Sequence, residues 1–240
     1  MRLDRYLKTE ALVMGSMRLR EADRIVTLYT RERGRLSAVA KGVRRTKSRI
    51  GGRLEPFSLV HVVLYSGSGS LYTITGVETV RSFQRVRDSL ERMEEGGRLL
   101  EAVRRLFPEE EGNPASFNLL VRGVARLAAA EDRPSAALAV LATRLKLLVA
   151  LGYLPELDSC VQCGSEEMLC GFRPSLGGMV CSDCYPQEHH DCFAISPDGL
   201  AALHYLLDNP LSKLDHSELD GFAAAEVERA VSQTLAHHGH

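Results

Sequence analysis

The sequence predicts an α+β protein in which a small β-barrel comes first and α-helices follow, with a cysteine-rich segment inserted among the helices. Three observations support this fold class. Residues 10–80 are rich in alternating and β-branched stretches, whereas apolar residues recur at helical spacing from residue 85 onward. All six cysteines of the 240-residue chain lie within 33 residues near its C-terminal third.

Five strands are expected in the N-terminal part. Residues 24–30 (RIVTLYT) are β-branched and aromatic, and residues 57–65 (FSLVHVVLY) form an apolar run that a Ser-Gly turn separates from a return strand at 71–80. Strands at 11–20 and 35–41 complete the set. Five strands with short turns suit a small closed barrel, for which the OB-fold is the five-stranded candidate. An SH3-like barrel is the competing interpretation, because strand count alone does not separate the two.

Helices are expected in the rest of the chain. Apolar stripes precede Pro108 and follow Pro114, and Ser196-Pro197 is typical of a helix N-terminus. The stripes are interpreted as core. The predicted division of the chain is an OB-fold nucleic-acid-binding domain at 1–80, an α-helical domain at 81–157 and 190–240, and a four-cysteine zinc-binding segment at 158–189.

The cysteines predict a metal site. Two CxxC pairs, Cys160/Cys163 and Cys181/Cys184, are separated by 17 residues. Each pair places two thiolates on one metal from a tight turn, and four thiolates make a tetrahedral structural zinc site with no open position for a water nucleophile. Redox-active dithiols and a ligand set that includes other residues remain as alternatives; the other residues are Cys170, Cys192, His189 and His190. Cys170 and Cys192 are otherwise expected to be a buried small residue and a bystander.

The formal net charge of −1 hides a strong polarity. Residues 1–60 hold 15 Lys+Arg against 6 Asp+Glu, a net of +9, whereas residues 151–240 hold 3 against 14, a net of −11. Such a split indicates that the N-terminal part meets a polyanion, with a solvated charged surface on each domain as the alternative. The residues expected to contact the phosphates of a nucleic acid are Arg33, Arg35, Lys41, Arg44, Arg45, Lys47, Arg49 and Arg53.

Single-strand binders also use ring faces on which bases stack. The rings of the expected barrel alternate with apolar neighbours, so each is interpreted as a core residue before a stacking platform. They are Tyr6, Tyr29, Phe57, Tyr65 and Tyr72.

Catalytic motifs are missing, so the chain is not expected to be an enzyme. There is no Gly-Lys dipeptide of a P-loop, no HExxH and no GxSxG. No apolar run is long enough to span a membrane, and the N-terminus lacks the features of a secretory signal. The expected location is therefore cytoplasmic.

Four segments together resemble the bacterial DNA repair protein family RecO. They are EADRIVTLYT at 21–30, GRLSAVAKGV at 34–43, RRTKSR at 44–49 and LEPF at 54–57. The likeness is strongest over the first 80 residues and extends to the whole chain by length, helical middle and late cysteine pairs.

The resemblance implies an N-terminal OB-fold, a helical domain and an embedded zinc-binding segment. It further implies a nucleoid-associated recombination mediator that binds single- and double-stranded DNA, anneals complementary strands and loads recombinase onto strands coated by single-strand binding protein. The implied partners are a RecR-type protein and the acidic C-terminal tail of single-strand binding protein. An RNA-binding OB-fold protein and a zinc-dependent nuclease are the alternatives, which a DNA–RNA competition and a strand-cleavage assay would separate.

Overall fold

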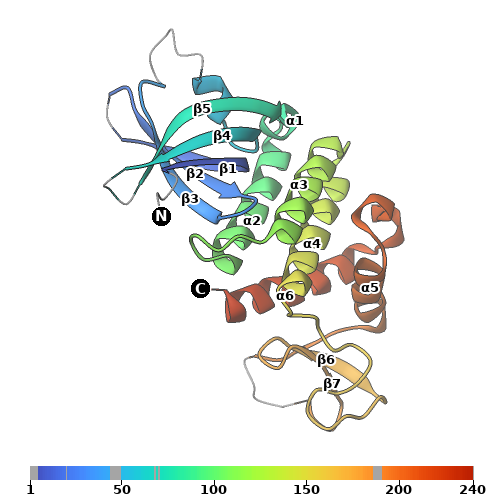
Figure 1. Cartoon of the computed structure of the whole chain (residues 1–240). Helices are drawn as coiled ribbons and strands as arrows, with labels where there is room; N and C mark the ends of the chain where they lie inside the picture. Colours follow the sequence, from blue (N-terminus) through green and yellow to red (C-terminus); the bar gives the residue numbers. More distant parts are fainter. Residues whose placement is uncertain are drawn as a thin grey trace. The chain divides into compact units, whose positions relative to one another are not determined.

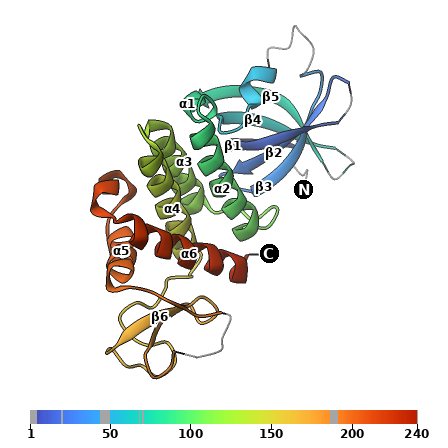
Figure 2. The same ribbon diagram turned by 180° about the vertical axis from the view of Figure 1, so that it is seen from behind.

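The computed structural model describes residues 5–19, 21–43, 50–67, 69, 71–185 and 191–239. The chain divides into two compact units, Met1–Ala129 and Ala130–His240. Each unit is described by itself (Figures 1 and 2).

The first unit contains a closed five-stranded barrel with the strand order β1-β2-β3-β5-β4. Neighbouring strands are antiparallel except β3 and β5, which are parallel and close the barrel. This OB-like barrel confirms the predicted fold class. Its strands are β1 (Tyr6–Arg18), β2 (Arg24–Thr30), β3 (Gly34–Ala40), β4 (Leu59–Ser66) and β5 (Tyr72–Arg81), with the 3-10 helix η1 (Gly51–Leu54) between β3 and β4.

The barrel interior is filled by side chains from alternate positions of every strand, as the two-residue period of a strand requires. Val13, Val26, Leu36, Val62 and Ile74 are among them, and each is buried. Strand β1 is long because its first half pairs with β4 and its second half with β2. A register shift between Val13 and Gly15 lies in the second half.

Helices α1 (Gln84–Arg87), α2 (Leu90–Leu106) and α3 (Pro114–Ala129) complete the first unit. The ring of Tyr29 on β2 lies 5.2 Å from that of Phe107 and 6.2 Å from that of Phe117, so aromatic packing joins the barrel to these helices. Gly96 on α2 leaves room for the ring of Phe57, since a Cβ there would lie 2.6 Å from that ring. The helices therefore cover the side of the barrel near the β2–β3 turn (Figures 1 and 2).

The second unit combines helices with a small sheet. The helices are α4 (Arg133–Ala150), α5 (Pro197–Asp208) and α6 (Gly221–His238), with short 3-10 turns η2 (Leu211–Lys213) and η3 (His216–Glu218). The sheet has the order β7-β6-β8 and is built from β6 (Leu169–Arg173), β7 (Gly178–Cys181) and β8 (Phe193–Ala194). Asp132 caps α4 and Ser196 caps α5, each by accepting a hydrogen bond from a backbone N–H of the first turn.

Candidate metal centre and nucleic-acid interface

Four cysteines converge at one end of the small sheet. The sulfur atoms of Cys160, Cys163, Cys181 and Cys184 all lie within 4.8 Å of one another, and those of Cys163 and Cys181 are 3.6 Å apart. Thiolates around a tetrahedral zinc ion, with Zn–S bonds of about 2.3 Å, are separated by roughly 3.8 Å. The four cysteines therefore form a group that could hold a metal ion, and their number, chemistry and spacing are compatible with zinc.

Two tight turns present these sulfur atoms. In the first, the N–H of Gly164 donates to the carbonyl of Cys160 at 2.8 Å, and Gly164 has a φ of +76°, which suits a residue without a side chain. In the second, the N–H of Cys184 donates to the carbonyl of Cys181 at 3.1 Å, directly after strand β7. The N–H of Ser182 donates to the carbonyl of Met168, which ties the second turn to the start of β6.

The thiols of this group differ in acidity. Burial raises the pKa of Cys160, but backbone N–H groups of Cys181, Cys163 and Gln162 favour its thiolate and bring the pKa down to about 6. Hydrogen bonding with the Cys163 thiol raises the pKa of Cys184 to about 12. Several sulfurs that compete for protons at such short range are poorly accommodated as thiolates by themselves, whereas a divalent cation stabilises all of them as ligands.

The other two cysteines stand outside the four-sulfur group, among the described residues. Cys170 lies on β6 and Cys192 just before β8, and burial raises the pKa of both thiols. Cys192 packs against the small cluster of Cys160, Val180 and Cys181. His189 and His190, which belong to the alternative ligand set, lie outside the described residues.

The cations predicted to contact DNA are divided between exposed and occupied positions. Lys41 is exposed at the end of β3, and Arg33 is exposed in the β2–β3 turn. Arg53 is exposed on η1, where its Nη1 donates to the carbonyl of Val77 at 2.8 Å. Arg44, Arg45, Lys47 and Arg49 lie outside the described residues.

Arg35 has an acidic neighbour that the sequence alone did not indicate. Its Nη1 lies 3.7 Å from Oε1 of Glu109, and its side chain is only 24% exposed. The loop that carries Glu109 is held against the β2–β3 turn, because the N–H of Glu110 donates to the carbonyl of Arg35. A Cβ on Gly34 would lie 2.1 Å from the carbonyl oxygen of Glu111, so the contact depends on a glycine.

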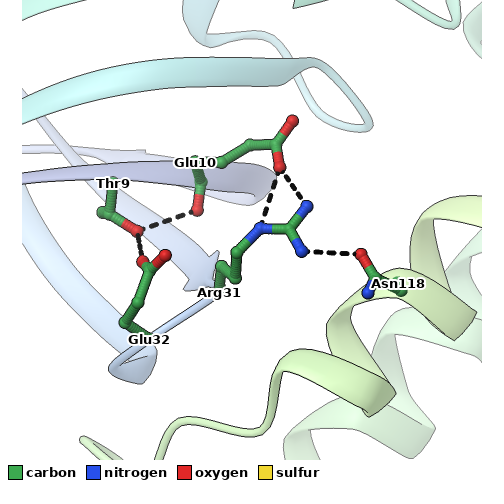
Figure 3. A network of polar contacts seen from close by, with 5 residues as sticks. All are labelled: Thr9, Glu10, Arg31, Glu32 and Asn118. Carbon is green, nitrogen blue, oxygen red and sulfur yellow. Dashed lines mark hydrogen bonds and ion pairs between the residues drawn. The ribbon is translucent and has the colours of Figure 1, made fainter.

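Arg31 is also occupied within the first unit (Figure 3). Its Nε donates to Oε2 of Glu10 at 3.1 Å, its Nη2 donates to the same oxygen, and its Nη1 donates to Oδ1 of Asn118 on α3 at 2.8 Å. The guanidinium also lies 4.8 Å from the ring centre of Phe117. Figure 3 shows Thr9 beside this network, where its hydroxyl donates to Glu32. Arg31 thus links β1, β2 and α3.

The aromatic rings of the barrel divide in the same way. Tyr29 and Phe57 are fully buried, and burial raises the pKa of Tyr29. Tyr72 is partly buried and packs against the barrel core. Tyr6 is exposed and its ring lies 5.2 Å from that of Tyr65, so these two rings form a pair at the surface.

Comparison with known proteins decides the family. The sequence profile described as "Recombination protein O N terminal" matches residues 1–83, and the one described as "Recombination protein O C terminal" matches residues 87–239. The chain belongs to the RecO family. The family is one of DNA repair and recombination, so the expectation drawn from the four N-terminal segments is confirmed.

Curated RecO proteins match most of the chain. The DNA repair protein RecO of Rubrobacter xylanophilus is 39% identical over 210 residues, which are 86% of this chain and 82% of that protein. The one of Caldanaerobacter subterraneus subsp. tengcongensis is 33% identical over 98% of this chain and 93% of its own length. The one of Symbiobacterium thermophilum is 37% identical over 93% and 88%. Among the residues that the structure describes, no helix of this RecO chain combines the length and apolar character needed to cross a membrane.

Proposed function

We propose that this RecO-family chain is a non-catalytic recombination mediator that binds single- and double-stranded DNA through the basic end of its barrel. The observation that carries the proposal is the placement of exposed Lys41 and Arg53 on either side of the basic segment RRTKSR at 44–49. A cluster of cations in and beside one connection needs little further geometry to contact phosphates. The acidic charge of residues 151–240 leaves the N-terminal part as the surface that attracts a polyanion.

Strand annealing follows from the same contact without covalent chemistry. Two complementary strands repel each other through their phosphates, and bound cations screen that repulsion while leaving the base edges free. Arg33, Arg35, Lys41, Arg44, Arg45, Lys47, Arg49 and Arg53 remain the proposed DNA-binding set. Arg35 joins that set only when the ion pair with Glu109 opens.

The metal in this proposal is one structural zinc ion held by Cys160, Cys163, Cys181 and Cys184. A closed shell of four thiolates leaves no position for an activated water, so zinc contributes folding energy and no hydrolysis. The domain limits proposed with it are 1–80 for the barrel, 158–189 for the zinc-binding segment, and the helical remainder at 81–157 and 190–240.

The partners are proposed from the family. They are a RecR-type protein and the acidic C-terminal tail of single-strand binding protein, with which the chain helps to load recombinase onto coated single strands. The proposed setting is the cytoplasm, at the nucleoid.

Salt dependence tests the DNA contact most directly. If about five cations neutralise phosphates, log affinity for a single strand falls with log salt at a slope of roughly −3 to −4. Replacing Arg44, Arg45 and Lys47 together by Ala is expected to flatten that slope by about two units, weaken binding to all sequences alike and reduce annealing in parallel.

The control is Arg104→Ala with Arg105→Ala, two arginines of α2 that pair with Glu101 on the same helix. The control is expected to keep the slope. A triple variant that binds and anneals like the parent would reject the basic segment as the contact. Tighter binding to RNA than to DNA in competition would favour an RNA-binding protein instead, and nucleotide hydrolysis or strand cleavage by the purified chain would contradict a non-catalytic role.

A further inference from the structure

A continuous row of side chains crosses all five strands of the barrel. Each member is the register partner of the next one, from β1 to β4, β5, β3 and β2 and then to the other end of β1. We call this row the belt; its members in spatial order are Tyr6, Tyr65, Thr73, Val39, Ile25 and Met17. Five inter-strand steps of about 4.8 Å give it a length of roughly 24 Å, running across the strands.

The belt faces outward from the barrel. The residues next to its members along the strands, including Leu7, Leu64 and Ala38, pack in the barrel core. Because successive side chains of a strand point to opposite faces, the belt residues lie on the outer surface. The two ends of the belt are the most accessible, with Tyr6 53% exposed and Met17 64% exposed.

A single exposed apolar side chain is ordinary on a protein surface. An aligned row of apolar and aromatic side chains on the outside of a barrel is less common and calls for an explanation. At one end the rings of Tyr6 and Tyr65 are tilted by 52° with centroids 5.2 Å apart, and the Tyr6 side chain remains accessible to a further flat partner. Ile25 and Val39 are partly exposed in the middle of the row.

Cations lie beside the belt. Lys8 is two residues from Tyr6 on β1 and so shares its face, and Lys41 follows β3 two residues beyond Val39. Arg5 and Arg18 adjoin the two ends of the belt, at the two ends of β1. All four are exposed, and none makes an ion pair within the part of the chain that the structure describes. Two acidic residues come two rows further along the strands, where Glu10 and Glu78 stand in register on either side of His61.

We infer that the unpaired bases of a single strand lie on the belt, with Tyr6 and Tyr65 as the stacking platform. This inference deepens the proposed function and rests on it. A row of apolar faces with positive charge beside it is complementary to a polymer with flat bases and a charged backbone. A peptide that adds as a β-strand is a poorer match, because a closed barrel offers no free edge.

Stacking and phosphate contact leave different signatures. Replacing both Tyr6 and Tyr65 by Ala is expected to weaken single-strand binding by roughly 5- to 150-fold, from the usual value of a base–ring contact. The salt slope is expected to stay unchanged because no cation is lost, and duplex affinity is expected to stay unchanged because paired bases cannot stack on the rings. Tyr6→Phe should bind like the parent, since the ring remains.

The matched control is Val80→Ala. Val80 is an exposed apolar residue of β5 that lies seven residues, or roughly 23 Å, from Thr73 along the strand. It is expected to leave single-strand affinity unchanged. Equal losses in single-strand and duplex binding would show that the tyrosine variants perturb the barrel as a whole, and would overturn the assignment.

A second measurement does not depend on a loss of binding. The chain contains no tryptophan, so Tyr6→Trp creates a unique fluorophore. Its emission is expected to be quenched when oligothymidylate binds, whereas that of Val80→Trp is not. Normal binding without quenching at position 6 overturns the belt and leaves the proposed function standing; absence of single-strand binding by the parent chain rejects the proposed function itself.

Discussion

Arg53 in the first unit and Arg144 in the second serve different purposes. Arg53 in the first unit is exposed on η1, beside the basic segment. In the second unit, Arg144 on α4 has a side chain only 7% exposed, and its Nη1 donates to both carboxylate oxygens of Glu228 on α6 at 2.7 and 2.8 Å. An exposed cation is available to an external anion, whereas the charge of a buried arginine is neutralised by a carboxylate of the same chain. The sign and number of charges in a segment therefore do not reveal its binding surface until their partners are known.

The two units also differ in what stabilises their β-sheets. The barrel encloses an apolar core to which every strand contributes. In the second unit, the buried cluster beside the cysteine turns comprises Cys160, Val180 and Cys181, while Phe172, Met179 and Phe193 of the same small sheet are also buried. Apolar burial on the scale of the three-residue cluster gives little stability, so we expect the two cysteine turns to depend on metal ligation.

Loss of metal is the largest effect expected from this difference. Cys160→Ser removes one of four ligands, and structural zinc contributes on the order of 10 kcal/mol to the folding of small zinc-binding segments. We expect one zinc per parent chain by elemental analysis, and for the variant a lower zinc content, a lower melting temperature and less soluble protein. Single-strand affinity of the surviving soluble protein should be retained, because the barrel has its own core.

Cys192→Ala is the matched control for this experiment. Cys192 lies outside the four-sulfur group, so the variant should keep its zinc. Parent protein purified without chelator and free of zinc would contradict the metal assignment. Equal zinc loss in both variants would show that the ligand set is different.

The next largest effect is expected in the first unit, from Gly34→Ala at the β2–β3 turn of the barrel. Gly34 has a φ of +63°, which costs a residue with a side chain about 1 kcal/mol, and its new Cβ would meet the carbonyl oxygen of Glu111. We expect a loss of about 2–4 kcal/mol in the free energy of unfolding measured with urea, from strain and displacement of the loop together.

Gly15→Ala is its control on the same barrel. Gly15 has no heavy atom within 4 Å of an added Cβ and no positive φ, so a change of less than about 1 kcal/mol is expected. Equal destabilisation by both variants would mean that the β2–β3 turn has no special dependence on glycine.

These contacts show which features a sequence can predict. The four cysteines were predictable as a group because two turns of four residues fix each pair locally. The barrel was predictable from alternation, but β1 begins at Tyr6 and not at the predicted residue 11. Its first five residues include Lys8 and Glu10, whose outward side chains obscure the apolar pattern that Leu7 and Ala11 contribute to the core.

Contacts between residues far apart in the sequence could not be predicted. Arg35 and Glu109 are separated by 74 positions, and each alone is typical of a solvated charge. The belt likewise depends on register across five strands, which single-strand patterns do not specify. The rings of the barrel could be named from the sequence, but which of them reach the surface could not.

Arg144→Ala tests the buried arginine and has a moderate expected effect. The variant loses the pair with Glu228 and the hydrogen bond from Nη2 to Oγ of Ser232 at 2.8 Å. Because the Glu228 side chain is 36% exposed and can be hydrated, we expect the free energy of unfolding to fall by about 2–3 kcal/mol. This loss is below the usual cost of breaking a fully buried ion pair. Urea denaturation measures it.

Arg133→Ala, at an exposed position of the same helix, should stay within about 0.5 kcal/mol of the parent. DNA affinity should not change in either variant, since neither arginine belongs to the proposed interface. A loss of DNA binding in a folded Arg144→Ala protein would mean that the second unit takes part in DNA contact.

The smallest effect is expected from Glu109→Gln. This variant tests whether Arg35, once freed from its ion pair, can contact DNA. Glu109 is exposed and its ion pair with Arg35 is long, so its removal should change stability by less than about 1 kcal/mol. Without the carboxylate, Arg35 has no anionic partner from this loop position and can turn to a phosphate. We then expect single-strand affinity at low salt to rise a few-fold and the salt slope to steepen by about 0.7, the contribution of one phosphate contact.

Glu101→Gln on α2, which frees Arg104 and Arg105 outside the proposed interface, is the control and should leave the slope as it was. An unchanged slope for Glu109→Gln would place Arg35 with Arg31 among the arginines that hold the first unit together, and would confine the DNA contact to the cations around the basic segment.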